Sequence, residues 1–215
     1  DAGGESAGDR FGAAVATAGD INGDGLSDLI VGAYAAGHNT GEAYVYYGAT
    51  EGLAETAGYT ATGTDMWNRF GEAVGLAGDV NGDGYADVYV GVPNDGAGEV
   101  HVYHGSLTGL SATPDWIGVG KGHGDHFGAA VDAAGDVNGD GYGDLVVGAY
   151  RGPNWRDRGA VYLYLGSPSG LRQTAVWSIA GENDADRFGQ VVGGAGDVNG
   201  DGFSDVVVGA PSYNG

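Results

Sequence analysis

The sequence has no cysteine, a single lysine and only eight Lys and Arg residues among its 215. Without cysteine there is no disulfide framework, no thiol catalysis and no zinc–cysteine site. The 29 Asp and Glu residues give a net charge of -21. Nucleic acid and anionic membrane surfaces both need clustered cations, so we expect neither as a partner. No apolar run approaches the roughly 18 residues of a membrane span and the N-terminal residues are not typical of a signal peptide, so we expect no membrane insertion.

Glycine is abundant, with 47 residues, but an apolar content of 42% is too high for a disordered chain. The glycines instead belong to an internal repeat of about 60 residues. Its first landmark is Asp-Arg-Phe-Gly or a close variant, found at 9–12, 68–71, 125–128 and 186–189. We therefore treat 1–215 as a single repeat domain, with repeats at 9–67, 68–124, 125–185 and 186–215.

Each repeat predicts four short strands, because segments rich in Val, Ile, Tyr and Trp alternate with Gly, Asn, Asp and Pro. The first strand starts at Phe-Gly, the second follows an acidic loop, the third is of the Gly-Glu-Ala-Tyr type and the fourth centres on Tyr59, Trp116 or Trp177. The last repeat lacks its third and fourth strands. The predicted fold is an all-β propeller of four-stranded antiparallel blades, with about three and a half blades in this chain. We expect an open arc, completed by the remainder of a propeller or by a second copy in a homodimer.

Four nine-residue segments, here called the acidic loops, connect the first and second strands of each repeat. They cover 20–28, 79–87, 136–144 and 197–205. Oxygen-bearing side chains fall at positions 1, 3, 5 and 9, glycine at position 6 permits a sharp turn, and position 7 can offer a backbone carbonyl. A hard cation such as Ca²⁺ takes six to eight oxygen ligands. Ordinary Asp-Gly and Asn-Gly turns are the alternative, but a turn needs no third carboxylate, and three aspartates in nine residues repel one another.

The sequence thus predicts about four Ca²⁺ ions, one in each acidic loop, acting as structural staples; Mg²⁺ is disfavoured because it tends to keep its waters. The predicted metal ligands, in chain order, are Asp20, Asn22, Asp24, Leu26, Asp28, Asp79, Asn81, Asp83, Tyr85, Asp87, Asp136, Asn138, Asp140, Tyr142, Asp144, Asp197, Asn199, Asp201, Phe203 and Asp205.

Phe-Gly, an Asp-x-Asn-Gly-Asp-Gly-x-x-Asp loop and Val-Gly-Ala-Pro together resemble the FG-GAP repeat of integrin α-subunit propellers, and the chain looks most similar to bacterial FG-GAP proteins. The resemblance covers essentially the whole chain. It implies a propeller with calcium in the acidic loops. Two departures stand out: integrin propellers have seven blades, and Arg-Gly-Asp does not occur in this sequence.

In an antiparallel blade the acidic loops and the loops between third and fourth strands share one face, and the remaining loops share the other. On that second face we predict a ligand site at Trp67, Arg151, Trp155, Arg156 and Arg158, because Trp and Arg are favoured interface anchors. The alternative is that they are ordinary loop residues making local ion pairs.

The predicted function is a calcium-stabilised, extracellular, non-enzymatic propeller used for adhesion, ligand recognition or self-assembly. No catalytic motif is present: the segment 166–170 has proline at the centre of a would-be Gly-x-Ser-x-Gly, and 118–122 lacks phosphate-loop spacing. The alternative function is a carbohydrate-binding or polysaccharide-processing propeller with its site on the face opposite the acidic loops. A purely architectural, self-associating module is a further reading.

Overall fold

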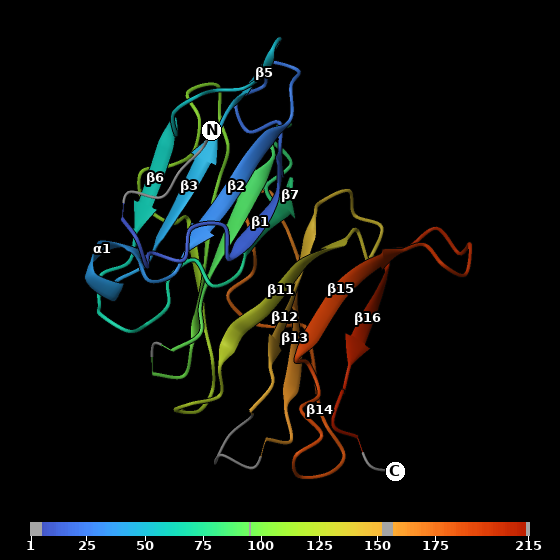
Figure 1. Cartoon of the computed structure of the whole chain (residues 1–215). Helices are drawn as coiled ribbons and strands as arrows, with labels where there is room; N and C mark the ends of the chain where they lie inside the picture. Colours follow the sequence, from blue (N-terminus) through green and yellow to red (C-terminus); the bar gives the residue numbers. More distant parts are fainter. Residues whose placement is uncertain (1–5, 95, 152–156, 214–215) are drawn as a thin grey trace.

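The computed structural model describes residues 6–94, 96–151 and 157–213. Its sheets follow one another along the chain as consecutive blades, from blue to red in Figure 1. Three sheets have four antiparallel strands, and a further antiparallel pair begins a fourth blade. The all-β, propeller-blade fold expected from the sequence is confirmed.

The first blade is ordered β1-β2-β3-β6, with bounds Ala14–Gly19, Asp28–Ala33, Glu42–Tyr46 and Tyr59–Thr62. The second is β7-β8-β9-β10, at Val74–Gly78, Asp87–Val92, Glu99–Tyr103 and Trp116–Val119. The third is β11-β12-β13-β14, at Phe127–Gly135, Asp144–Ala149, Ala160–Tyr164 and Trp177–Ala180. The last pair is β15 and β16, at Val191–Gly196 and Asp205–Gly209.

Three short elements are not expected from the sequence. These are α1 (Ala36–Asn39) and a hairpin of β4 (Gly48–Ala49) and β5 (Gly52–Leu53). The α1 segment is an irregular turn, because Gly37 and His38 both have positive φ. Among the described residues, no helix has the length and apolar character needed to cross a membrane.

The first strand starts later than expected in three of the four repeats. Phe-Gly precedes β1, β7 and β15, and only β11 begins at its phenylalanine. All four repeats have a turn at this point: the N–H of Ala13 donates to the carbonyl of Arg10 (3.0 Å), and the following repeats have the same bond. In the third repeat Phe127 still pairs with Ala149, and regular pairing resumes at Ala130 after a shift of register. Gly12 has φ +80° within this turn, a conformation that favours glycine.

The core lies between successive blades. The first strands β1, β7, β11 and β15 contact one another in series, so they form the inner wall of the arc. Phe70 is buried between the first two blades with Val45 and Val90, and Phe127 is fully buried between the second and third. Phe11, at the free side of the first blade, is only half-buried and packs edge-to-face on Tyr44. Phe70 and Phe127 thus join blades.

A glycine in each second strand lets the next blade approach. A Cβ placed on Gly91 would lie 2.2 Å from the carbonyl oxygen of Gly128, and Gly32 and Gly148 face the next blade in the same way at 2.0 Å. No other residue fits such a contact. Gly209 holds the same position in the last repeat, where a Cβ would find only Val191 at 3.5 Å.

Because the two glycines have different surroundings, replacement by alanine should cost much more stability at Gly91 than at Gly209. Gly91→Ala should lower the free energy of unfolding by about 2–3 kcal/mol, since a methyl group would force two blades apart. Gly209→Ala is the matched control and should cost under about 0.5 kcal/mol. Urea unfolding followed by near-UV circular dichroism measures both. Equal losses would show that blade contact does not set the requirement for glycine.

Candidate metal centres

The acidic loops are wound by their own side chains. Asp20, at position 1 of the first loop, accepts hydrogen bonds from the N–H groups of Gly23 (2.7 Å), Asp24 (3.1 Å) and Gly25 (2.8 Å). Gly23 and Gly25 have φ values of +72° and +84°, so the winding needs glycine at positions 4 and 6. The same bonds recur in the other three loops, from Asp79, Asp136 and Asp197.

Positions 3 and 5 follow the same scheme. Asn22 accepts from the N–H of Asp24 at 3.0 Å, and its amide donates to the Asp24 carboxylate at 3.0 Å. Asp24 in turn accepts from the N–H of Leu26 at 2.9 Å. The two bonds from backbone N–H groups recur in all four loops and the amide bond recurs in the first three, so the sequence pattern specifies one loop conformation.

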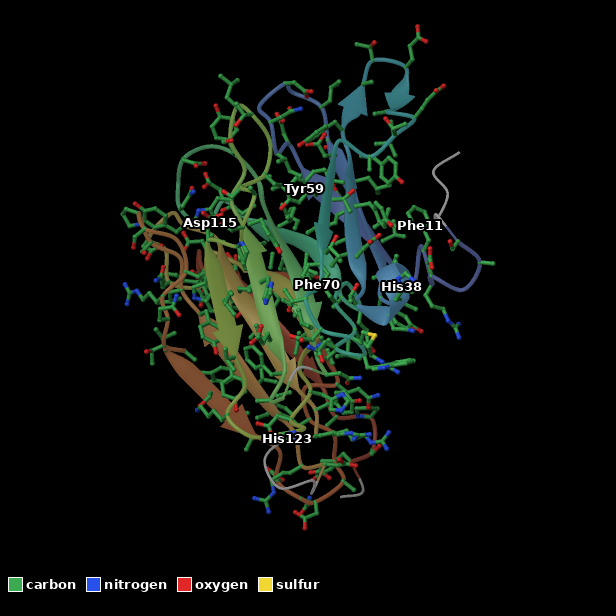
Figure 2. The ribbon with its side chains drawn as sticks, turned by 90° about the vertical axis from the view of Figure 1, so that its left-hand side faces the viewer. Phe11, His38, Tyr59, Phe70, Asp115 and His123 are labelled. Carbon is green, nitrogen blue, oxygen red and sulfur yellow. The ribbon has the colours of Figure 1, made fainter. Side chains whose placement is uncertain are left out.

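The aspartate at position 9 ties the loop to the rest of its blade. Asp28 is buried, and it accepts from the N–H of Ile21 (2.9 Å) and from the N–H of Gly48 (2.8 Å). Asp87 and Asp144 make the equivalent pairs of bonds. Since Gly48 follows the third strand, these bonds place the two loops of each blade on one face, here called the acidic-loop face. Figure 2 separates Asp115, on this face, from His123 on the opposite face.

The loops concentrate negative charge. Burial raises the pKa of Asp87 to about 7, and the charges of Asp83 and Asp79 push it in the same direction. Burial likewise raises the pKa of Asp28 and of Asp144, again with a contribution from the two other carboxylates of the loop. Three carboxylates in each of these loops therefore lie close enough to repel one another.

The donor chemistry of each loop fits a hard cation. Three carboxylates and one amide oxygen per loop are ligands that Ca²⁺ prefers. Oδ1 of the position-1 aspartate accepts two backbone hydrogen bonds, whereas an oxygen that accepts one retains a second lone pair. Within 6–94, 96–151 and 157–213, however, no three His, Asp or Glu side chains lie close enough together to hold a metal ion. The ligand sets listed from the sequence therefore remain predictions.

Adjacent acidic loops are joined in series, a feature that the sequence alone does not reveal. The N–H of Ala86 donates to the carbonyl of Asp20 at 3.0 Å, and the same bond links the later loops at 2.8 and 2.9 Å. The ring of Tyr85, at position 7, covers Gly23, so that a Cβ there would lie 2.7 Å from the ring. Tyr142 and Phe203 cover the corresponding glycines of the second and third loops. Each of the first three loops is thus held by the loop of the next blade.

The residues predicted for a ligand site do not form one cluster. Trp67 is 66% exposed, and with Tyr34, Asn39, Arg69 and Asn94 it lines a hollow of about 240 Å³. Arg151 and Arg158 belong to a loop of the third blade and are not part of this hollow. Arg158 pairs with Asp184 at 3.5 Å. The predicted site residues Trp155 and Arg156 lie outside the described residues. The sequence analysis missed Arg69, whose guanidinium lies 5.4 Å from the centre of the Tyr34 ring.

Repeated four-stranded blades with a wound acidic loop between the first two strands define a propeller-repeat protein. The FG-GAP repeat model matches this chain at 11–46, 70–103, 127–164 and 188–215, so the chain belongs to the FG-GAP repeat family.

Curated relatives include integrin alpha-4 of Xenopus laevis, 38% identical over 160 residues, and integrin alpha-PS2 of Drosophila melanogaster, 37% identical over 166 residues. The matches cover 70% and 68% of this chain but only 15% and 12% of those proteins. The chain thus spans less than a sixth of their length. Among solved structures, the exotype rhamnogalacturonan lyase YesX superposes with a TM-score of 0.54 at 16% identity. That match covers 90% of this chain and 38% of the lyase, and it shows likeness of fold alone.

If calcium stabilises the chain through its acidic loops, removal of one position-5 carboxylate should reduce the rise in melting temperature that calcium causes. We expect Asp83→Asn to lose about one quarter of the rise in melting temperature that calcium causes, since one of four loops is weakened. Without calcium the same variant should melt slightly higher than the unaltered chain, because a repulsion is removed.

Asp65→Asn, an exposed aspartate outside the loops, is the matched control and should leave the calcium response unchanged. Thermal unfolding in EGTA and in millimolar calcium measures both effects. If Asp83→Asn and Asp65→Asn respond alike, the second acidic loop is not a calcium site.

Proposed function

We propose that this chain is a calcium-stabilised, non-enzymatic propeller module that recognises a protein ligand outside the cell. The observation that carries the proposal is the fourfold repetition of one acidic loop, with the same backbone hydrogen bonds to the position-1 aspartate, in a member of the FG-GAP family. The adhesive role is proposed because the chain is similar in sequence to integrin alpha chains.

Bound calcium would be held by the oxygens at positions 1, 3, 5, 7 and 9, and it would neutralise the carboxylates that crowd each loop. At calcium a hundredfold above the dissociation constant, each site would contribute about 2.7 kcal/mol to the free energy of unfolding. Because each loop is hydrogen-bonded to the next, fixing one loop also fixes the surface on which its neighbour packs. Calcium would then act as the staple that disulfides provide in other extracellular proteins.

Recognition is proposed for the face opposite the acidic loops. Its exposed Trp67 stands beside a hollow with donors from Arg69 and the amides of Asn39 and Asn94, and exposed aromatic and arginine side chains favour protein contact. A panel of extracellular matrix proteins and a glycan array, both probed in calcium and in EGTA, test this role.

We expect calcium-dependent binding to a protein, at least tenfold weaker after Trp67→Ala if this side chain is an anchor. Trp177→Ala, on the outer strand of the third blade, is the control. Binding to glycans alone, or turnover of a bound polysaccharide, would overturn the proposal in favour of the carbohydrate alternative.

We also propose that a second copy covers the free end of the arc. In the last repeat Gly200 has no atom within 4 Å of a Cβ position, whereas its counterparts in the earlier repeats are covered by a side chain of the next loop. On the strands of the same last repeat, Val191 of β15 and Val207 of β16 are 63% and 59% exposed. The first loop offers Leu26 at the covering position, so the first blade of another copy supplies the missing contact.

Self-association through these ends predicts a dimer or larger assembly in calcium. Sedimentation equilibrium in calcium and in EGTA measures the mass, and Val207→Glu should shift the chain to monomer while Val119→Glu, exposed on the outer strand β10, should not. If the chain is a monomer in calcium at every accessible concentration, a second copy does not cover the free end of the arc.

A further inference from the structure

The residue before each Phe-Gly pair carries a basic side chain in a backbone conformation that does not call for one. These four residues, here called the basic ring, are Arg10, Arg69, His126 and Arg187. Their φ values are +61°, +61°, +55° and +54°. Non-glycine residues seldom adopt this left-handed region, and Asn, Asp and His are the ones enriched in it. The turn therefore does not explain the arginine that stands at three of the four positions.

The neighbouring residues of the same turn have clear structural roles. The phenylalanine that follows packs between blades. The aspartate directly before the basic residue closes the loop. The Asp125 carboxylate accepts a hydrogen bond from the N–H of Gly122 at 2.6 Å, and the Asp186 carboxylate accepts one from the N–H of Asn183 at 2.8 Å. Both carboxylates are buried, so neither faces the surface to neutralise the basic side chain. Of the four basic side chains, Arg69 pairs with Glu72 and His126 packs on Tyr150, whereas within the described ranges no ion pair holds Arg10 or Arg187.

The repeat places these side chains around the axis of the arc. Each directly precedes a first strand or the turn that leads into it, and the first strands contact one another as the inner wall. The loops concerned lie on the face opposite the acidic loops. The His126 ring packs on Tyr150 at 5.2 Å. Burial lowers the pKa of His126, and the charges of Arg151 and Arg69 lower it further, so the field of Arg69 reaches the next blade.

Most of this positive charge is available for binding. Glu72 accepts two hydrogen bonds from one Nη of Arg69, at 2.9 and 3.1 Å, which leaves the other guanidinium donors. Arg10 and Arg187 are exposed, and within the described ranges neither has a carboxylate within 4 Å. Of the described Lys and Arg residues, Arg172 is the one in a loop on the acidic-loop face. In a chain of net charge -21, the other described Lys and Arg residues thus lie on the opposite face.

We propose that the basic ring is the contact surface for an acidic segment of a protein ligand. The inference rests on the proposed role in protein recognition and names the chemistry of its partner. Ligand carboxylates would receive charge-assisted hydrogen bonds from the ring arginines. The acidic loops, on the other face, would repel the same segment and so restrict docking to the ring.

The test uses a fluorescent hexaglutamate peptide and the unaltered chain in 1 mM calcium and moderate salt. Arg10→Ala combined with Arg187→Ala should weaken binding about tenfold or more. Arg10→Lys with Arg187→Lys should recover most of it, and Arg172→Ala combined with Lys121→Ala, which removes the same charge outside the ring, should leave the affinity within about twofold. Melting temperatures confirm that every variant is folded.

Equal losses in the ring and control variants, or no loss in either, would overturn the proposal, because binding would then follow net charge or calcium bridging. Hexagalacturonate bound more tightly than hexaglutamate, with the same dependence on the ring, would also overturn it in favour of an acidic glycan. If hexaglutamate does not bind but a matrix protein binds in calcium, the basic ring fails while the proposed function stands. If neither binds, the recognition role itself fails.

Discussion

The constraint on which the structure depends is the crowding of three carboxylates into each nine-residue acidic loop. The loop holds them in place by giving each its own backbone donors, and in the first three loops the position-9 aspartate is buried. A buried carboxylate beside two others is costly, as the rise in the pKa of Asp87 to about 7 reflects. The first three repeats all carry this cost, and a divalent cation bound in the loop, as proposed above, would offset it.

The same loops connect the blades to one another. The N–H at position 8 of one loop donates to the carbonyl at position 1 of the loop before it, and the side chain at position 7 covers the glycine at position 4. On the opposite side of the disc, Phe-Gly of one blade lies under the glycines of the previous one. The high glycine content follows from these close approaches and from the left-handed turns, and the acidity follows in large part from the loops.

The periodicity of the sequence was sufficient to predict the strands, their order within a blade and the sharing of a face by the acidic loops and the later loops. It did not predict α1 or the β4–β5 hairpin, since these depend on the positive φ of Gly37 and on local pairing within one loop. The late start of β1 was missed because Phe-Gly looks like the beginning of a strand, and only the Arg10 turn shows otherwise.

The candidate sites divide in the same way. The acidic loops were found because four copies of one spacing are visible in the sequence, and their metal content remains a prediction. The contacts between loops were invisible, since they join residues about 60 positions apart through backbone atoms. The basic ring could have been noticed in the recurring Asp-Arg-Phe-Gly motif, but its significance needs the left-handed backbone of Arg69 and its counterparts.

The central claim, that the acidic loops are calcium sites that hold the arc together, is tested most directly by calorimetric titration of calcium into the chain after EGTA treatment and dialysis. Four ions per chain are predicted, with a rise in melting temperature that saturates at the same calcium concentration as the binding isotherm. Absence of binding at millimolar calcium, with an unchanged melting temperature, would contradict it.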